Sequence, residues 1–332
     1  MAFVSGWCND WLREEHSLSS HPPVERSCRR SEGLAMQPGL QALRIKKIRR
    51  AGGPRYFWER YFWLSLGFLL ALFSLPTLAQ QAQQPQPHTQ ILWLGHSAVR
   101  ITTPGGKNIV IDPFIMQNPA TPRVWKDYVK LGPVDLLLVT HGHADHTGDV
   151  FALSRIHRAP VYAPAGLAST FQTLGLLPPD LTPMMNKGGT VTPLGPNIKI
   201  SMVHADHSSE FVQLDPFTNR RVTFNGGEPA GFIIELENGF RIYHMGDTAL
   251  FSDLRLIAQR YHPDLVMIPI GGTFTMDPKD AAIALKEYLK PKYAIPIHYG
   301  TFPALTGTPQ ELIEALGPGT TQVIVMQPGD TH

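Results

Sequence analysis

The chain contains very little cysteine. Of its 332 residues only Cys8 and Cys28 carry a thiol, and both lie near the N-terminus. Beyond residue 28 no disulfide can form, so the rest of the chain can fold in an oxidising compartment. Metal ligands in that larger part must come from His, Asp or Glu rather than from cysteine sulfur.

A long hydrophobic run is also missing. The main apolar stretch, Phe62–Leu75, has 14 residues, which is short for a bilayer span of about 20 residues. A basic segment at residues 44–55 precedes it, and the small-x-small pattern Thr77-Leu78-Ala79 follows. This layout is typical of a cleaved secretory signal peptide. An uncleaved membrane anchor is the alternative, because the stretch lengthens if Tyr61 and Ala79 are counted.

These features divide the chain into four parts. We expect a basic leader region at residues 1–60, of which 1–35 are dispensable, and an apolar region with its cleavage site at 61–79. A Gln/Pro linker at 80–90 then leads into a folded body at 91–332. The body is expected to be periplasmic or secreted, with membrane contact only through an uncleaved leader.

Positive charge is scarce in the body, although the whole chain has a net charge of +2. Residues 1–60 hold 11 Lys/Arg and 6 Asp/Glu, which leaves 18 and 21 for the rest of the chain, a net charge of about −3. The basic pI therefore reflects the leader and gives no support to nucleic-acid binding. A small-molecule substrate is the expected partner.

The body alternates short apolar runs with helical patterns. Strands are predicted at 91–94, 99–102, 109–111, 134–139, 161–163, 198–203, 232–236, 241–244, 265–268, 293–297 and 323–326. Helices are predicted at 147–156, 167–174, 249–260, 278–289 and 309–316. The last two begin with Asp277-Pro278 and Thr308-Pro309, a capping residue followed by proline. Strands mixed with helices predict an α/β body in which helices cover sheets.

One segment carries most of the chemical information. Directly after the predicted strand 134–139 stand His141, His143, Asp145 and His146. In extended backbone His141 and His143 point the same way and can bind one ion together. Asp145 and His146 can both face a second ion only if the chain curls, which Gly142 and Gly148 would permit. The pattern favours a two-metal centre over a histidine-rich surface loop.

Three later segments can complete such a centre, because each follows a predicted strand. They are His204-Ala205-Asp206-His207, His244-Met245-Gly246-Asp247 and Ile297-His298-Tyr299. Each ion of a hydrolytic pair needs about three protein ligands and an open position, and a carboxylate often bridges the two ions. Spacing alone leaves His204 and His207 both open as ligands.

Together these motifs resemble the metallo-β-lactamase superfamily over the whole body from Ile91. Further motifs are similar to a poorly characterised branch of metal-dependent hydrolases related to ascorbate-phosphate lactonases. They are Trp93-Leu94-Gly95-His96-Ser97, Ile111-Asp112-Pro113, Gly271–Met276 and His298–Pro303. The resemblance implies an αββα sandwich, with two mixed sheets and helices on the outer faces. The β-lactamase branches commonly use a Cys ligand, which this body lacks, and that difference argues against a β-lactam substrate.

The resemblance also implies a ligand set. One metal would be held by His141, His143 and His207, and the other by Asp145, His146 and His298, with Asp247 bridging. It favours His207 over His204.

Three further residues are candidates for support or substrate contact. His96 lies near the pocket in the resembling family, with a structural role as the alternative. Asp112 either holds a ligand histidine or caps the turn at Pro113. Tyr299 is either a donor to a developing oxyanion or a buried aromatic residue.

The expected activity is hydrolysis by a metal-bound hydroxide, since two divalent ions acidify water and polarise a substrate oxygen. Asp145 would orient the nucleophile and carry its proton to the leaving group. A lactone or other ester-like bond is the favoured substrate. A phosphodiesterase or phospholipase-like activity and a non-catalytic metal-binding module are the alternatives. The histidine-rich set suits zinc, and manganese or iron would tolerate it.

Overall fold

The computed structural model describes residues 88–332. The leader, the signal peptide and most of the linker fall outside the described residues, so these predictions are not tested. Within residues 88–332 no helix has the length and apolar character needed to cross a membrane.

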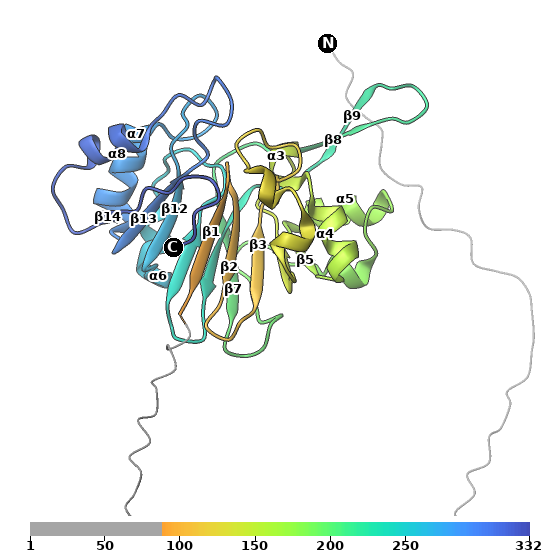
Figure 1. Cartoon of the computed structure of the whole chain (residues 1–332), viewed down its shortest axis with the longest axis horizontal. Helices are drawn as coiled ribbons and strands as arrows, with labels where there is room; N and C mark the ends of the chain where they lie inside the picture. The colour runs from red at the N-terminus through yellow and green to blue at the C-terminus, as the bar shows by residue number, and fades with distance from the viewer. Residues whose placement is uncertain (1–87) are drawn as a thin grey trace, which may run out of the picture. The chain divides into compact units, whose positions relative to one another are not determined.

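The described body consists of two β-sheets packed face to face, with helices on the outer faces (Figure 1). The first sheet has the strand order β1-β2-β3-β4-β5. Its strands are β1 (Gln90–Gly95), β2 (Ala98–Thr102), β3 (Asn108–Ile111), β4 (Leu136–Leu138) and β5 (Val161–Tyr162). Pairing is antiparallel from β1 to β3 and parallel from β3 to β5, so the sheet is mixed.

The second sheet has the order β14-β13-β12-β11-β10-β7-β6 and is mixed as well. Its strands are β6 (Thr190–Val191), β7 (Lys199–His204), β10 (Ala230–Glu235), β11 (Arg241–His244), β12 (Leu265–Pro269), β13 (Tyr293–Ile297) and β14 (Gln322–Val323). Pairing is antiparallel from β6 to β11 and parallel from β11 to β14.

Short helices connect the strands and cover the sheets. The α-helices are α2 (Tyr128–Leu131), α3 (Ala144–Thr147), α4 (Val150–His157), α5 (Ala165–Thr173), α6 (Leu254–Tyr261), α7 (Pro278–Ile283) and α8 (Pro309–Leu316). Two 3₁₀ turns, η1 (Arg123–Trp125) and η2 (Pro179–Leu181), and a π-helical segment, η3 (Ala284–Leu289), complete the set in this part of the chain.

Three apolar clusters show the layers. One lies between the two sheets and includes Ile101 and Phe232. A second packs the seven-stranded sheet against α6, α7 and α8, and a third packs the five-stranded sheet against α4 and α5. Burial of apolar side chains from both faces of each sheet is the main stabilisation of such a fold. The predicted αββα arrangement is therefore confirmed.

The predicted helix starts at Pro278 and Pro309 are also confirmed. The Asp277 carboxylate accepts hydrogen bonds from the backbone N–H groups of Lys279 and Asp280. Thr308 and Glu311 form a reciprocal capping box at the start of α8.

Three predicted elements have different bounds in the structure. The helix predicted from Ala249 begins at Leu254, and the backbone N–H of Ala249 donates to the Asp206 carbonyl. The helix predicted at 147–156 is divided into α3 and α4, because the backbone N–H of Asp149 donates to the Pro113 carbonyl instead of to the preceding turn. The Asp149 carboxylate accepts from the backbone N–H groups of Ile115 and Met116. The strand predicted at 323–326 pairs with β13 only at its start, opposite Ala294, and Pro296 further along β13 has no N–H to extend the ladder.

The segment from Phe211 to Pro229 is polar and rich in turn residues, yet it is not an irregular loop. It contains the β-hairpin β8 (Glu210–Leu214) and β9 (Arg221–Asn225), which projects from the body (Figure 1). One apolar pair, Phe211 with Phe224, lies across it at its base. Such cross-strand pairs stabilise a hairpin even where most of its residues are polar.

Candidate metal centre

The candidate site residues lie where strands end, at one edge of the sandwich. Within the first sheet β1, β3 and β4 run in the same direction, and in the second β7, β11 and β13 do so. His96 follows β1, the His141–His146 segment follows β4, and His298 follows β13. Residues as far apart in sequence as His96 and His298 therefore meet because of the strand order.

The curl required after β4 is made by α3, whose first turn contains Asp145 and His146. Neither Gly142 nor Gly148 uses a left-handed backbone conformation, so the curl does not depend on the positive φ that glycine permits. Gly142 is needed for space instead, since a Cβ there would lie 3.0 Å from the carbonyl oxygen of Glu210.

Asp247 lies at the centre of the site. It is 3% exposed, and its carboxylate is within 4.0 Å of four imidazoles. The distances to Asp247 Oδ2 are 2.9 Å from His298 Nε2, 3.7 Å from His207 Nε2 and 4.0 Å from His141 Nε2; Oδ1 is 3.4 Å from His146 Nε2. A carboxylate in this position can contact two ions at once, as a bridging ligand does.

A first group of ligand atoms consists of His141, His143 and His207, all within 4.8 Å of one another. His141 Nε2 and His143 Nδ1 are 2.9 Å apart. The other ring nitrogen of His143 lies 2.9 Å from the Glu210 carboxylate. A proton on that nitrogen leaves Nδ1 of His143 as the atom that faces the group. Burial lowers the pKa of His141 and of His207, which favours the neutral imidazole that binds metals.

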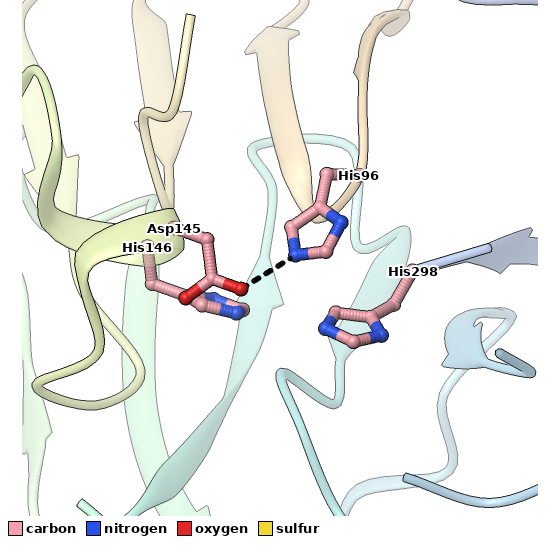
Figure 2. Close-up of side chains that lie close together, drawn as sticks. All are labelled: His96, Asp145, His146 and His298. Atoms are coloured by element: carbon pink, nitrogen blue, oxygen red, sulfur yellow. Dashed lines mark hydrogen bonds and ion pairs between the residues drawn. The ribbon is translucent and has the colours of Figure 1, made fainter. Parts of the chain in front are cut away.

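A second group consists of His96, Asp145, His146 and His298 (Figure 2). Asp145 Oδ2 is 3.1 Å from His96 Nε2, and the rings of His96 and His298 are 4.0 Å apart. His96 is therefore a possible ligand of the predicted second ion as well as a neighbour of Asp145.

Several buried atoms at the centre lack a hydrogen-bond partner in the described part of the chain. These are Nε2 of His146, Nε2 of His298 and Oδ1 of Asp247. Leaving buried polar atoms unpaired costs about 1–3 kcal/mol each. The three lie close together, since His146 Nε2 and His298 Nε2 are 3.4 and 2.9 Å from the Asp247 carboxylate. Two imidazoles and a carboxylate around one point are a donor set that a divalent cation fits.

Asp112 supports this centre by holding the ring of His146. Its Oδ2 accepts from His146 Nδ1 at 2.8 Å, and its Oδ1 accepts from the Thr140 backbone N–H at 2.8 Å. Burial alone would lower the pKa of His146, but the carboxylates of Asp247 and Asp112 outweigh it and hold that pKa well above its ordinary value. The same negative charges that favour a proton on His146 favour a cation beside it.

Two other predicted candidates lie elsewhere. The Tyr299 hydroxyl donates to the Met326 carbonyl at 3.3 Å, and its ring stacks on Trp93 with centroids 5.3 Å apart. Its hydroxyl is therefore engaged away from the site rather than offered as an oxyanion donor, and its ring is partly buried against the core between the sheets. His204 is exposed at the end of β7 and packs against Phe251 with centroids 5.0 Å apart.

His244 also lies away from the ligand groups and is a core residue. It is buried on β11, and its Nε2 lies 3.0 Å from the Ser97 carbonyl.

The site opens into a pocket of about 360 Å³. The pocket is lined by seven polar residues, His96, His143, Asp145, His207, Ser208, Asp247 and His298, and by three apolar ones, Phe274, Phe302 and Leu305. Sequence reasoning did not identify the apolar residues or Glu210 as part of the site. Glu210 stands three residues after His207, and Phe274 and Phe302 lie within the Gly271–Met276 and His298–Pro303 motifs, which are the only signals for them in the sequence.

Comparison with known proteins identifies the family. Residues 107–299 match the β-lactamase superfamily domain. The chain is 56% identical over 243 residues to a UPF0173 metal-dependent hydrolase of Cupriavidus metallidurans, covering 73% of this chain and 84% of that protein. It is 53% identical over 266 residues to a UPF0173 metal-dependent hydrolase of Polaromonas sp., covering 80% and 97%.

Solved structures of other proteins are also similar to this chain. Igni18, a novel metallo hydrolase from the hyperthermophilic archaeon Ignicoccus hospitalis, is 32% identical with a TM-score of 0.63, covering 74% of this chain and 97% of that one. The metallo-β-lactamase fold protein YhfI from Bacillus subtilis is 14% identical with a TM-score of 0.52, covering 74% and 98%, and shows the shared fold alone. The metal-binding role of each individual residue stays a prediction. The chain itself belongs to the UPF0173 metal-dependent hydrolase family of the metallo-β-lactamase superfamily.

Proposed function

We propose that this metal-dependent hydrolase cleaves a lactone or other ester-like bond at a centre for two divalent ions. His141, His143 and His207 would hold one ion, Asp145, His146 and His298 the other, and Asp247 would lie between them. The observation that supports this most strongly is the convergence of four imidazoles on the buried Asp247 carboxylate within 4.0 Å. When bound, two such ions acidify a water molecule and polarise the oxygen of the scissile bond.

Asp145 is the residue that we propose to act on the attacking water. It lines the pocket, and His96 Nε2 lies 3.1 Å from its Oδ2, which fixes the direction of its carboxylate. Oriented in this way, Asp145 can align the water and pass its proton to the leaving group. No covalent intermediate with the protein is needed.

The charge of the pocket favours an ester over a phosphodiester. Among the described residues that line it, none is Lys or Arg, the side chains that usually contact phosphate oxygens. A carbonyl group that is neutral in the ground state needs no such partner. Phosphodiester hydrolysis is the second candidate, because a binuclear centre can itself neutralise phosphate charge.

Zinc is the proposed metal, since imidazole ligands predominate, although the Asp/His set around Asp145 would accept manganese or iron.

We also propose that the protein is exported and acts on a small molecule outside the cytoplasm. This rests on the basic segment, the apolar stretch and the Thr77-Leu78-Ala79 pattern. N-terminal sequencing of protein recovered from the periplasm or medium tests it, and a start at or near Gln80 is expected.

Elemental analysis of the purified protein tests the metal centre. We expect about two metal equivalents per chain, falling to one or fewer in Asp247→Ala. Asp180→Ala is the matched control, because Asp180 is an exposed carboxylate paired with Arg158 on the surface. Fewer than half an equivalent after reconstitution of the wild type would mean that the ligand set does not assemble.

The metal-loaded protein is then offered a panel of lactones and a bis-aryl phosphate. Acid release from a lactone that is lost in Asp247→Ala supports the proposal. Preferential release of the chromogenic alcohol from the phosphodiester supports the second candidate instead.

A further inference from the structure

Two kinds of side chain line the pocket. The first kind comprises predicted metal ligands, whereas the second comprises Phe274, Phe302 and Leu305. Ser208 and His96 are the two remaining lining residues. A substrate bound with its scissile bond at the ligands would therefore place its remaining atoms against apolar side chains.

Phe302 is held in place on one side and open on the other. Its ring packs edge-on against His96 with centroids 5.6 Å apart, and against Phe114 at 6.3 Å. The side chain nevertheless remains 38% exposed. A ring fixed next to His96 and open toward the pocket can bind an apolar group without the entropy cost of ordering its own side chain.

Phe274 also lines the pocket and is 61% exposed. It lies in a tight turn in which Thr273 has a φ of 58°. A β-branched residue in the left-handed region is strained, and such strain is commonly found at ligand clamps. The turn is fixed by a hydrogen bond from Thr273 Oγ1 to the Ala304 carbonyl at 2.9 Å.

That hydrogen bond joins the two loops that carry the phenylalanines. The loop after β12 holds Phe274 and the loop after β13 holds Phe302, and a second bond connects Gly307 N to the Gly271 carbonyl at 3.2 Å. The two rings are therefore presented by one connected unit rather than by independent loops. Large exposed apolar side chains at the mouth of a pocket are the usual sign of a ligand-binding surface.

We propose that the substrate is an uncharged ester or lactone carrying an apolar substituent of several carbons or an aromatic ring, which Phe274 and Phe302 bind. This rests on the proposed function, because it places the scissile bond at the same ligands. It goes further by assigning the two phenylalanines as the residues that set specificity.

The first test measures kcat/KM of the metal-loaded protein for p-nitrophenyl acetate, butyrate and hexanoate. Each methylene buried against the phenylalanines is expected to raise kcat/KM by about fourfold. Phe302→Ala and Phe274→Ala are expected to lower the hexanoate-to-acetate ratio by about tenfold, and Phe302→Leu to retain most of it. Phe217→Ala is the matched control, because Phe217 lies at the tip of the β8–β9 hairpin and is 95% exposed.

The second test does not depend on turnover. Hexanohydroxamate and acetohydroxamate share one metal-chelating group and differ only in the apolar chain. Calorimetry on the metal-loaded protein is expected to show at least tenfold tighter binding of the longer compound, and this preference should disappear in Phe302→Ala. Equal affinities, or no binding of either compound, would overturn the apolar subsite.

The two tests separate failure of this inference from failure of the proposed function. Ester hydrolysis with no dependence on chain length, together with equal hydroxamate affinities, would leave the function standing and remove the subsite. A hydroxamate preference without hydrolysis of any ester would retain the apolar subsite and reject the ester substrate.

Discussion

Three residues of the site occupy a backbone conformation that few residues other than glycine adopt. His96, Asp112 and His298 have φ values of 58°, 46° and 54°, each immediately after a strand. Such conformations cost roughly 1–3 kcal/mol each and persist where the surrounding structure holds them. Here the His96 carbonyl accepts from the backbone N–H of His298 at 3.0 Å and from Trp93 Nε1 at 2.9 Å. The strain is thus concentrated where side chains must turn toward one centre.

Asp112→Asn tests how far the ligand histidines depend on their supporting carboxylate. The amide removes the negative charge that accepts from His146 Nδ1, so we expect metal affinity at the second ligand group to fall by roughly 10–100-fold. A competitive chelator titration measures this without reference to activity.

Asp135→Asn is the matched control for this variant. Asp135 also accepts from a backbone N–H, that of Asn108 at 2.8 Å, but it precedes β4 and contacts no candidate ligand. Unchanged affinity in both variants would show that Asp112 is needed only for the local turn.

The residues with metal-binding side chains could be predicted from the sequence, but their contacts could not. His141, His143 and Asp145 stand in a short motif with the spacing of ligands, and the family resemblance separates His207 from His204. The contact of His96 with Asp145 joins residues 49 positions apart. That of Glu210 with His143 joins residues 67 positions apart. Neither pair leaves a local pattern, because only the packing of the strands brings them together.

At the scale of elements, the ends of the strands determine the site. Predicted strands were recognised wherever a buried apolar run was bounded by turn residues, as in β11 and β13. The β8–β9 hairpin was missed because most of its residues are exposed, so the sequence shows little apolar periodicity there. Its base nevertheless contributes Glu210 to the site, beside His143.

The close approach of the β12 and β13 exits leads to a second prediction. A Cβ on Gly271 would lie 2.2 Å from the carbonyl oxygen of His298. Gly271→Ala must therefore displace the backbone of a predicted ligand. We expect about 1–3 kcal/mol lower unfolding free energy and a loss of metal from the second ligand group, measured by urea unfolding and elemental analysis.

Gly319→Ala is the control for this variant, since a Cβ there meets nothing within 4 Å and the backbone needs no positive φ. If Gly271→Ala kept both the stability and the metal content of the wild type, the two strand exits would not be coupled through this contact.

At the scale of the whole molecule, the α/β class followed from the mixture of strands and helices. The division into two sheets came from the family resemblance. Composition and periodicity do not reveal that β1 to β5 form one sheet and that β7 pairs with β10 in the other. Such pairing depends on contacts distant in sequence. The folded body and the metal centre are consequently linked, because the ligands come from both sheets.

This link predicts that metal stabilises the whole body, through ligands that only the folded chain brings together. At a free metal concentration 100 times the Kd, one site adds about 2.7 kcal/mol. For a domain of this size each kcal/mol raises the Tm by about 2–4 °C. We therefore expect chelator to lower the Tm of the wild type by several degrees. His207→Ala should lose the share due to the first ligand group, whereas His204→Ala, which removes an exposed ring packed on Phe251, should retain the full metal-dependent shift. Calorimetric melting with and without chelator measures this shift in Tm. A full shift in His207→Ala together with a reduced shift in His204→Ala would assign the ligand role to His204 instead.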